Sequence, residues 1–247
     1  MQLHLSSWPE IEAYLQTSKT ILIPIGSTEQ HGPIGLLGTD ALCSEMIARR
    51  AGDEGGFLVG PTFNVGQAQH HMAFPGTITL RPSTMIAAMT DWANSLRRHG
   101  FERIYWLNGH GGNVATMNAA FSEIHHTTSL NPKSNQPALR CTMRNWWELG
   151  GVSDTIRELF PAGEGSHATP SEISVTRYFF PQLEKQADIA VKIAPTGPIF
   201  DADDFRRRYP DGRIGSDPTQ ANAAAGERLV QTAVRSLVRE FRVFSAA

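Results

Sequence analysis

Short runs of aliphatic, aromatic and β-branched residues recur along the chain, separated by polar segments. Four such runs, in chain order, are Ile21–Ile25, Phe57–Val59, Arg103–Leu107 and Ala138–Met143. The first three are followed by loops that contain Gly or Pro. Runs of this length and content, bounded by turn residues, are typical of β-strands. The chain is therefore predicted to contribute several short strands to a sheet.

Between these runs, apolar residues repeat with the period of an amphipathic helix. One such face comprises Met85, Ile86, Met89, Ala93 and Leu96. Ser83 is the predicted N-cap of this helix, and Gly100 lies just beyond its end. Other helices are predicted near Asp40, at Val114–Thr128 and near Pro170.

The last segment predicts a long helix after an Asp217-Pro218 start. Its apolar face comprises Leu229, Val230, Ala233, Leu237 and Phe241. Strands alternating with helices of this length predict an α/β fold, a three-layer α/β/α arrangement around a mostly parallel central sheet.

Two stretches show neither periodicity and are predicted to be loops, Asn131–Pro137 and Ala194–Pro218. Within the second, the charged run Asp201–Arg208 is interpreted as a solvated surface segment. No shift in composition divides the 247 residues, of which 40% are apolar and 19% charged. We therefore expect a single domain spanning residues 1–247.

The balance of charge excludes several classes of partner. The formal net charge is −2, which gives no positive field to attract nucleic acid or an anionic membrane.

The N-terminal residues lack the basic and apolar pattern of a secretion signal, and no apolar run is long enough to span a bilayer. The two cysteines, Cys43 and Cys141, do not suggest a disulfide framework. We expect a cytoplasmic protein, with Cys43 as a small buried side chain.

Three polar, glycine-containing segments each follow a predicted strand. They are Gly26–Asp40, Asn64–Thr77 and Asn108–Asn113, and together they hold four of the nine histidines. In an open α/β sheet, ligands bind beyond the carboxyl ends of the strands. The three segments are therefore predicted to converge on one site at that edge.

Glu29 and His31 are two residues apart, so in an extended chain both side chains project to the same side and can share a metal ion. Taken alone, this pair is better explained as two surface polar residues. Asp40 also has a second explanation, because a carboxylate at a helix start is stabilised by free N–H groups and by the helix dipole.

His110 favours the metal interpretation. Its neighbours Gly109, Gly111 and Gly112 are expected to allow positive φ and the close approach of an ion or substrate. Two carboxylates and two imidazoles suit Zn²⁺, Mn²⁺ or Fe²⁺, and one carboxylate can bridge two ions. The predicted ligands are Glu29, His31, Asp40 and His110. We expect them to hold one or two ions per subunit, with Asp40 bridging the two ions when both are bound.

His167 and Glu172 add an imidazole and a carboxylate further along the chain. They are candidates for catalysis, but the capping of a helix that starts near Pro170 explains them equally well.

These segments together resemble the creatininase family of metal-dependent amidohydrolases. The resemblance runs through IPIGSTEQHGP with GTD, HMAFPGT, NGHGGN, the segment of His167 and Glu172, and GSDPTQANAAAGE. It implies that Glu29, Asp40 and His110 surround one metal, and that His31 and Asp40 contribute to a second. It also implies a homohexamer that hydrolyses C–N bonds of cyclic amides, formamides or peptides with zinc, manganese or iron.

The sequence departs from the creatinine-hydrolysing members at two places. Those members carry Glu at the position of Gly112, as a ligand of the second metal, so here either Glu172 replaces it or the second site is weak or empty. They also place Trp-Asp where this chain has Gly163-Glu164, next to the creatinine ring. Creatinine is therefore not the expected substrate.

The expected substrate contacts, all near the converging segments, are His71, Gly111, Gly112, Trp147 and Glu164. The reaction implied is attack of a metal-activated water on an amide-type carbonyl of a small molecule. His167 is expected to protonate the departing nitrogen, and Glu172 either orients His167 or binds the second metal. The alternatives are a peptidase that trims short peptides and a non-catalytic protein that binds a metal or metabolite.

Overall fold

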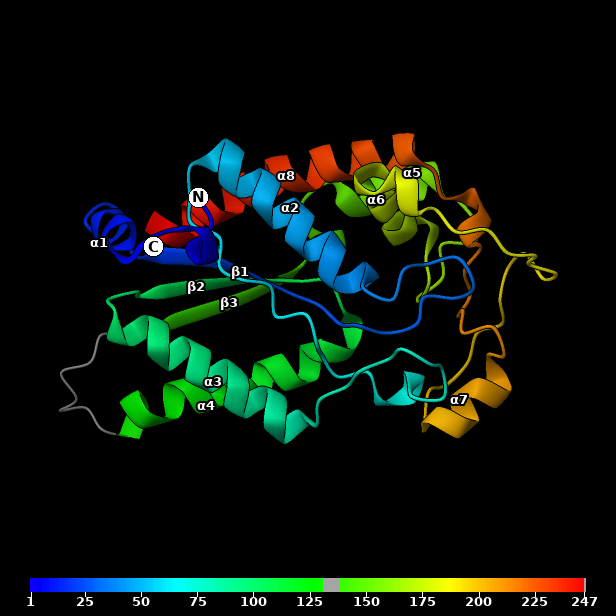
Figure 1. Ribbon diagram of the computed structural model, residues 1–247, viewed down its shortest axis with the longest axis horizontal. Coiled ribbons are helices and arrows are strands. Elements are labelled where there is room, and N and C mark those ends of the chain that lie inside the picture. Colours follow the sequence, from blue (N-terminus) through cyan, green and yellow to red (C-terminus); the bar gives the residue numbers. More distant parts are fainter. Residues whose placement is uncertain (131–137, 247) are drawn as a thin grey trace.

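A parallel three-stranded sheet in the order β1-β2-β3 forms the centre of the structure (Figure 1). The computed structural model describes residues 1–130 and 138–246, so the predicted loop Asn131–Pro137 lies outside the described residues. The strands are β1 (Thr20–Ile25), β2 (Arg103–Asn108) and β3 (Arg140–Asn145). The predicted first and third runs are confirmed as strands, and the fourth begins two residues later than predicted, at Arg140.

Helices cover both faces of the sheet, as the three-layer prediction requires. In Figure 1, α2 (Thr39–Gly55) and α8 (Ala223–Ala246) lie above the strands, and α3 (Pro82–Arg98) and α4 (Val114–Leu130) lie below them. The remaining helices are α1 (Trp8–Leu15), α5 (Val152–Leu159), α6 (Pro170–Phe179) and α7 (Ala202–Arg208). Of these, α5 and α6 pack against α8.

Alternation of side chains along the strands divides the core into two apolar layers. Ile21, Ile23 and Ile25 face the apolar layer between the sheet and α3 and α4. Leu22 faces the layer between the sheet and α2 and α8. Because successive strand residues point to opposite faces, an unbroken aliphatic strand fills both layers. The predicted apolar face of α8 is also confirmed, since all five of its residues are buried.

The prediction of a strand at Phe57–Val59 was wrong. Val59 makes only isolated parallel bridges, one to Gln2 and one to Leu22 of β1. Gly60 and Phe63 donate to the carbonyls of Leu22 and Pro24 in β1. These donors are three residues apart in the chain, whereas a parallel ladder needs donors two residues apart, so the pairing is not continuous along this edge of β1.

The prediction of a loop at Asp201–Arg208 was also wrong, although most of its charged side chains are exposed at the surface, as predicted. Residues Ala202–Arg208 form α7, with the Asp201 side chain accepting from the N–H of Asp204 at 2.8 Å. Phe205 within it is fully buried. One apolar residue among charged ones gives little periodic signal, yet here it anchors a short helix.

Two helix starts differ from the prediction. Helix α3 has Arg81, not Ser83, at its N-cap, because Pro82 takes the first helical position that its fixed φ favours. Helix α8 begins at Ala223, after a separate 3-10 turn at Pro218–Gln220. The helix start near Asp40 and the buried Cys43 are as predicted.

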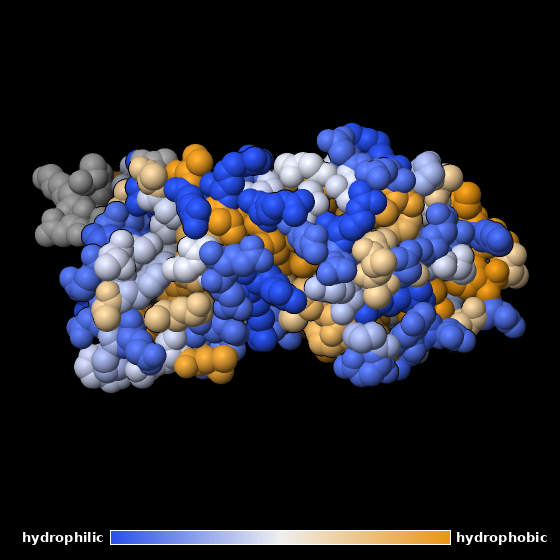
Figure 2. Space-filling view, turned by 90° about the horizontal axis from the view of Figure 1, so that it is seen from above, coloured by the Kyte–Doolittle hydropathy of each residue, from blue (hydrophilic) through white to orange (hydrophobic). Residues whose placement is uncertain are grey.

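Figure 2 shows the molecule from the side that carries α2 and α8. Hydrophilic side chains cover most of this face, with hydrophobic patches between them, several of them at the right-hand end of the view. Among the described residues, no helix is both long and apolar enough to cross a membrane.

Candidate metal centre

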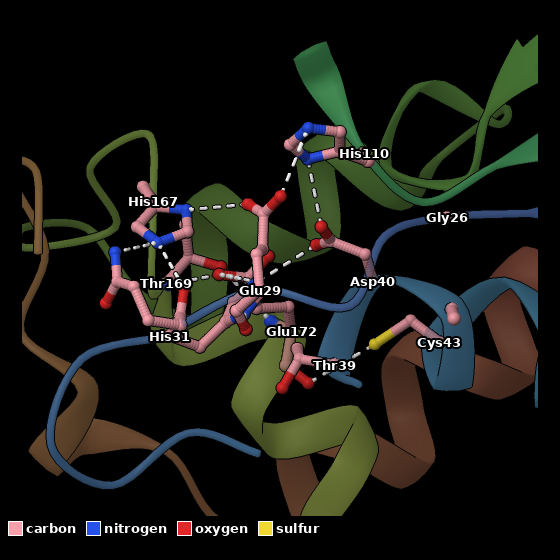
Figure 3. Close-up of polar contacts among 12 residues, drawn as sticks. Gly26, Glu29, His31, Thr39, Asp40, Cys43, His110, His167, Thr169 and Glu172 are labelled. Carbon is pink, nitrogen blue, oxygen red and sulfur yellow. Dashed lines mark hydrogen bonds and ion pairs between the residues drawn. The ribbon is translucent and has the colours of Figure 1, made fainter. Parts of the chain in front are cut away.

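The carboxyl ends of β1 and β2 bring the predicted polar segments together. Glu29 and His31 lie in the loop after β1, Asp40 lies in the first turn of α2, and His110 follows β2 directly. His167 lies just before α6. Figure 3 shows these side chains pointing toward one another. All five are buried, and the Glu29 side chain is completely so.

Asp40 lies between two imidazoles. Its Oδ1 accepts from Nε2 of His31 at 2.9 Å, and its Oδ2 lies 2.9 Å from Nδ1 of His110 (Figure 3). The far nitrogen of each ring is held by a backbone carbonyl: Nδ1 of His31 donates to Glu29 O at 3.1 Å, and Nε2 of His110 donates to Gln67 O at 3.0 Å. Carbonyl partners of this kind orient the histidines of metal sites.

Glu29 faces three imidazoles, of which His110 also contacts Asp40. Its Oε2 lies 3.3 Å from Nε2 of His110, and its Oε1 lies 3.2 Å from Nε2 of His71 and 3.8 Å from Nδ1 of His167. The two buried carboxylates of Glu29 and Asp40 therefore share one set of histidines. Such a set concentrates negative charge where a cation could enter.

The electrostatics of the carboxylates and imidazoles are strongly coupled. Burial alone would lower the pKa of His31, but Asp40 and Glu172 reverse this and raise it to about 10. Burial is likewise overcome for His110, whose pKa rises to about 9 beside Glu29 and Asp40. Burial would raise the pKa of Asp40, but His31 and His110 hold it well below its usual range. The carboxylates thus stay ionised, as metal ligands must be.

The donor set fits divalent metal ions. Three groups of side chains bring their ligand atoms within 4.8 Å of one another: Glu29 with Asp40 and His110, His31 with Asp40 and Glu172, and Glu29 with His31 and His167. Both Glu29 oxygens and Oδ2 of Asp40 are buried without a hydrogen-bond partner among the described residues. Buried carboxylate oxygens are costly unless a cation or donor compensates them. Asp40 belongs to two of the groups, as the predicted bridge would.

Glu172 both caps the start of α6 and lies near His31 of the centre. Its Oε1 accepts from the N–H of Thr169 at 2.6 Å and closes a capping box at the start of α6. The same oxygen lies 4.0 Å from Nε2 of His31. Burial raises the pKa of Glu172 to about 7, an effect that His31 opposes.

A cavity of about 700 Å³ opens beside these groups. It is lined by Asp40, His110, His167 and Glu172 and by every residue predicted to contact substrate, namely His71, Gly111, Gly112, Trp147 and Glu164. The structure thus brings the predicted contacts to one place.

Two of these residues have surroundings that the sequence did not predict. His71 is buried with both ring nitrogens against protein groups, Nε2 near Glu29 and Nδ1 2.8 Å from Nε2 of Gln30. Glu164 accepts from the hydroxyl of Ser171 through Oε1, while its Oε2 is buried without a partner and burial raises its pKa. Trp146, the neighbour of the predicted contact Trp147, is almost fully buried in the core, although it also borders the cavity.

The expectation of positive φ around His110 was wrong. Gly109, Gly111 and Gly112 are absent from the described residues that adopt it. Close approach explains two of them instead. A Cβ at Gly109 would collide with the backbone of Asp40, and one at Gly112 would collide with the His110 ring and lie 2.7 Å from Gln67 O. The backbone here leaves little room for the Glu that the resemblance led us to consider at position 112.

Sequence reasoning missed His70 and Gln30. His70 lines the cavity and packs against His71, with ring centroids 4.0 Å apart and the rings tilted by 47°. Gln30 is buried between the two predicted ligands Glu29 and His31 and contacts both His71 and His167. The only signal available in the sequence was that each of them is adjacent to a predicted site residue.

Comparisons with known proteins place this site in a wider context. The family profile described as "Creatininase: Creatinine amidohydrolase" matches residues 4–241. The chain is 24% identical over 253 residues to a creatinine amidohydrolase of Pseudomonas putida, covering 96% of this chain and 94% of that protein. It is 33% identical over 235 residues to a mycofactocin precursor peptide peptidase of Mycobacterium tuberculosis (strain ATCC 25618 / H37Rv), covering 90% and 84%.

Solved structures share the fold. A mutant creatininase of the Zn-Zn type superposes with a TM-score of 0.86 at 22% identity, covering 100% of this chain and 98% of that one. A creatininase described with Mn gives a TM-score of 0.83 at 22% identity, with coverage of 100% and 99%.

Proposed function

The chain belongs to the creatininase family, and we propose on this basis that it is a metal-dependent amidohydrolase that cleaves a C–N bond of a small molecule. The observation that carries the proposal is the group of Glu29, Asp40 and His110. Their ligand atoms meet beside the cavity, and three of the carboxylate oxygens are buried without a hydrogen-bond partner in the part of the chain that the structure describes.

In this proposal, Glu29, Asp40 and His110 hold one ion, while His31, Asp40 and Glu172 hold a second. When bound, a divalent ion supplies a Lewis acid that makes water nucleophilic near neutral pH and polarises a carbonyl. Zinc, manganese and iron all suit this ligand set. Glu172 takes the place of the carboxylate that Gly112 cannot provide.

The protein's own residues then move the proton and hold the substrate. As the water oxygen bonds to the carbonyl carbon, one water proton passes to His167, which borders the cavity. When the C–N bond breaks, His167 returns that proton to the departing nitrogen. Burial keeps the pKa of His167 well below its usual value, so it is neutral and able to accept the proton.

The cavity walls define the substrate that fits. Trp147 offers an aromatic surface, and Glu164 offers a carboxylate toward N–H groups. A volume of about 700 Å³ is large enough for more than a single small ring. This observation, with the similarity to a peptide peptidase, favours trimming of a short peptide as the second candidate function.

The test combines metal analysis with a substrate screen. Purified protein would be stripped with a chelator, reloaded with zinc, manganese or iron, and offered lactams, formamides and short peptides. Turnover is expected only after reloading. Undiminished turnover in the stripped protein would refute the metal-dependent scheme, and a full metal load without turnover of any C–N substrate would favour a binding protein.

We also propose a homo-oligomer, by family a homohexamer. Apolar side chains in the segment before α7 are exposed, among them Val191 and Phe200 at 60% each, and such patches commonly mark contacts between subunits. Mass measurement in solution would test this, and a monomer at micromolar concentration would contradict it.

A further inference from the structure

The side-chain amide of Gln30 lies buried between two histidines of the site. Its Nε2 lies 2.8 Å from Nδ1 of His71, 2.9 Å from Nε2 of His167 and 2.8 Å from the backbone carbonyl of Gly212. Its Oε1 accepts from the backbone N–H of Gly32 at 2.8 Å. A backbone N–H can only donate and a carbonyl can only accept, so these two groups fix which end of the amide is nitrogen.

The same reasoning assigns the amide hydrogens. Nε2 has two hydrogens but three close neighbours, and one hydrogen goes to the carbonyl of Gly212. Nε2 of His167 also lies 2.8 Å from the backbone oxygen of Gln30, which only accepts. That ring nitrogen therefore carries a hydrogen and cannot accept from the amide. The second amide hydrogen is left for Nδ1 of His71.

These assignments fix where each ring holds its proton. Since Nδ1 of His71 accepts, its proton is on Nε2, which lies 3.2 Å from Oε1 of Glu29. His167 holds its proton on Nε2, and its Nδ1 lies 3.8 Å from the same Glu29 oxygen, beyond hydrogen-bond range. The two rings are stacked with centroids 4.3 Å apart.

We propose that Gln30 is a positioning residue that holds His71 and His167 in the tautomer protonated at Nε2. His71 then turns its N–H toward the Glu29 carboxylate, 3.2 Å away, and His167 presents an unprotonated Nδ1 to the centre. The inference deepens the proposed function, because His167 must take a proton at Nδ1 before it can protonate the departing nitrogen.

The close packing around Gln30 supports a dedicated role. A Cβ at Gly212, whose φ is 84°, would collide with the Gln30 amide. The loop that carries Gly212 is braced by the buried Arg213, which donates to the carbonyls of Val191, Lys192 and Ser216 at 2.6, 2.8 and 2.9 Å. The backbone acceptor that orients the amide is thus itself held in place.

The first test needs no mutation. Zinc-loaded protein labelled with ¹⁵N in the histidine rings would be examined by long-range ¹H–¹⁵N correlation, which distinguishes protonated from unprotonated ring nitrogens. Both His71 and His167 are expected to carry their proton on Nε2. A proton on Nδ1 of either ring would overturn the proposal.

The second test replaces the amide nitrogen with an oxygen of the same size. In Gln30→Glu, an acceptor faces Nδ1 of His71, so the His71 proton is expected to move to that nitrogen. We expect kcat to fall about 10- to 100-fold, the usual effect of losing a partner that orients a site histidine, while KM and zinc content change little. Gln69→Glu, at an exposed glutamine two residues before His71, is the matched control and should leave the spectrum and kcat unchanged.

The role of Gln30 would be refuted if Gln30→Glu and Gln69→Glu had equal kcat and the His71 proton stayed on Nε2 in Gln30→Glu. If Gln30→Glu fails to fold, the spectrum of the unmodified protein still decides the tautomers. The spectrum does not depend on turnover, so a protein that cleaves no C–N substrate but shows both rings protonated at Nε2 would refute the proposed function and support this inference.

Discussion

Gly112→Ala is expected to weaken metal binding by displacing His110. A Cβ at this position would lie 2.7 Å from the carbonyl oxygen of Gln67 and closer still to Nε2 of His110, whereas real Cβ atoms essentially never come within 3.0 Å of another atom. Gly111 is the matched control, because a Cβ there would meet nothing within 4 Å.

The size of the effect follows from which atoms must move. The Gln67 oxygen has to retreat by about 0.3 Å, the difference between 2.7 and 3.0 Å, and the His110 ring by more. The two atoms that must move are also the two ends of the hydrogen bond that orients His110. Disturbing such a partner typically costs about 10- to 100-fold in metal affinity. This corresponds to about 1.4 to 2.7 kcal/mol.

Competition titrations with a chromophoric zinc chelator would measure this on the unmodified protein, Gly112→Ala and Gly111→Ala, alongside kcat on any substrate found. Only Gly112→Ala should bind zinc more weakly. Gly112→Glu adds the carboxylate that creatinine-hydrolysing relatives carry, but its Cβ meets the same obstacle, so it should weaken binding too. Equal affinity in the two alanine variants, or a gain of tight binding in Gly112→Glu, would refute the reasoning.

Three further predictions concern the centre and the core. His110→Ala should lose both metal and turnover while His167→Ala keeps the metal and loses turnover; metal analysis beside kcat checks this, and metal loss in both variants would contradict the division of roles. Glu172→Gln should keep the cap of α6 but hold at most one ion, whereas Thr169→Ala should keep the metal and lose about 1 kcal/mol of stability in urea unfolding; two ions in Glu172→Gln would exclude Glu172 as a ligand. Phe241→Ala should cost about 3–5 kcal/mol in the same assay, because its ring is buried and stacks on another in the core; a loss below 1 kcal/mol would show that α8 is not anchored there.

The fold could be predicted wherever apolar residues follow one period. Ile21–Ile25 became a strand and the face of Leu229 and Phe241 packed inward, because burial on a sheet or helix imposes that period. Where a single residue supplies the burial, the pattern fails. Phe205 anchors α7 amid charged neighbours, and the strand-like segment at Phe57 pairs with β1 only through isolated bridges.

The site was partly predictable for a similar reason. Polar segments after strands gather at one edge of a parallel sheet, so Glu29, Asp40 and His110 could be expected to meet. Which nitrogen of each ring faces the centre depends on distant carbonyls such as that of Gly212, and no local pattern encodes such contacts. Gln30 and His70 therefore emerged only from the structure.

The side chains of the centre come from segments far apart in sequence, the loops after β1 and β2 and the start of α6. An unfolded chain cannot hold them together, so an ion that binds there stabilises only the folded form. At a concentration about 1,000 times its Kd, such an ion adds about 4 kcal/mol to the free energy of unfolding. The melting temperature should therefore rise with the supply of free metal, and starvation for that metal would shorten the lifetime of the protein in the cell.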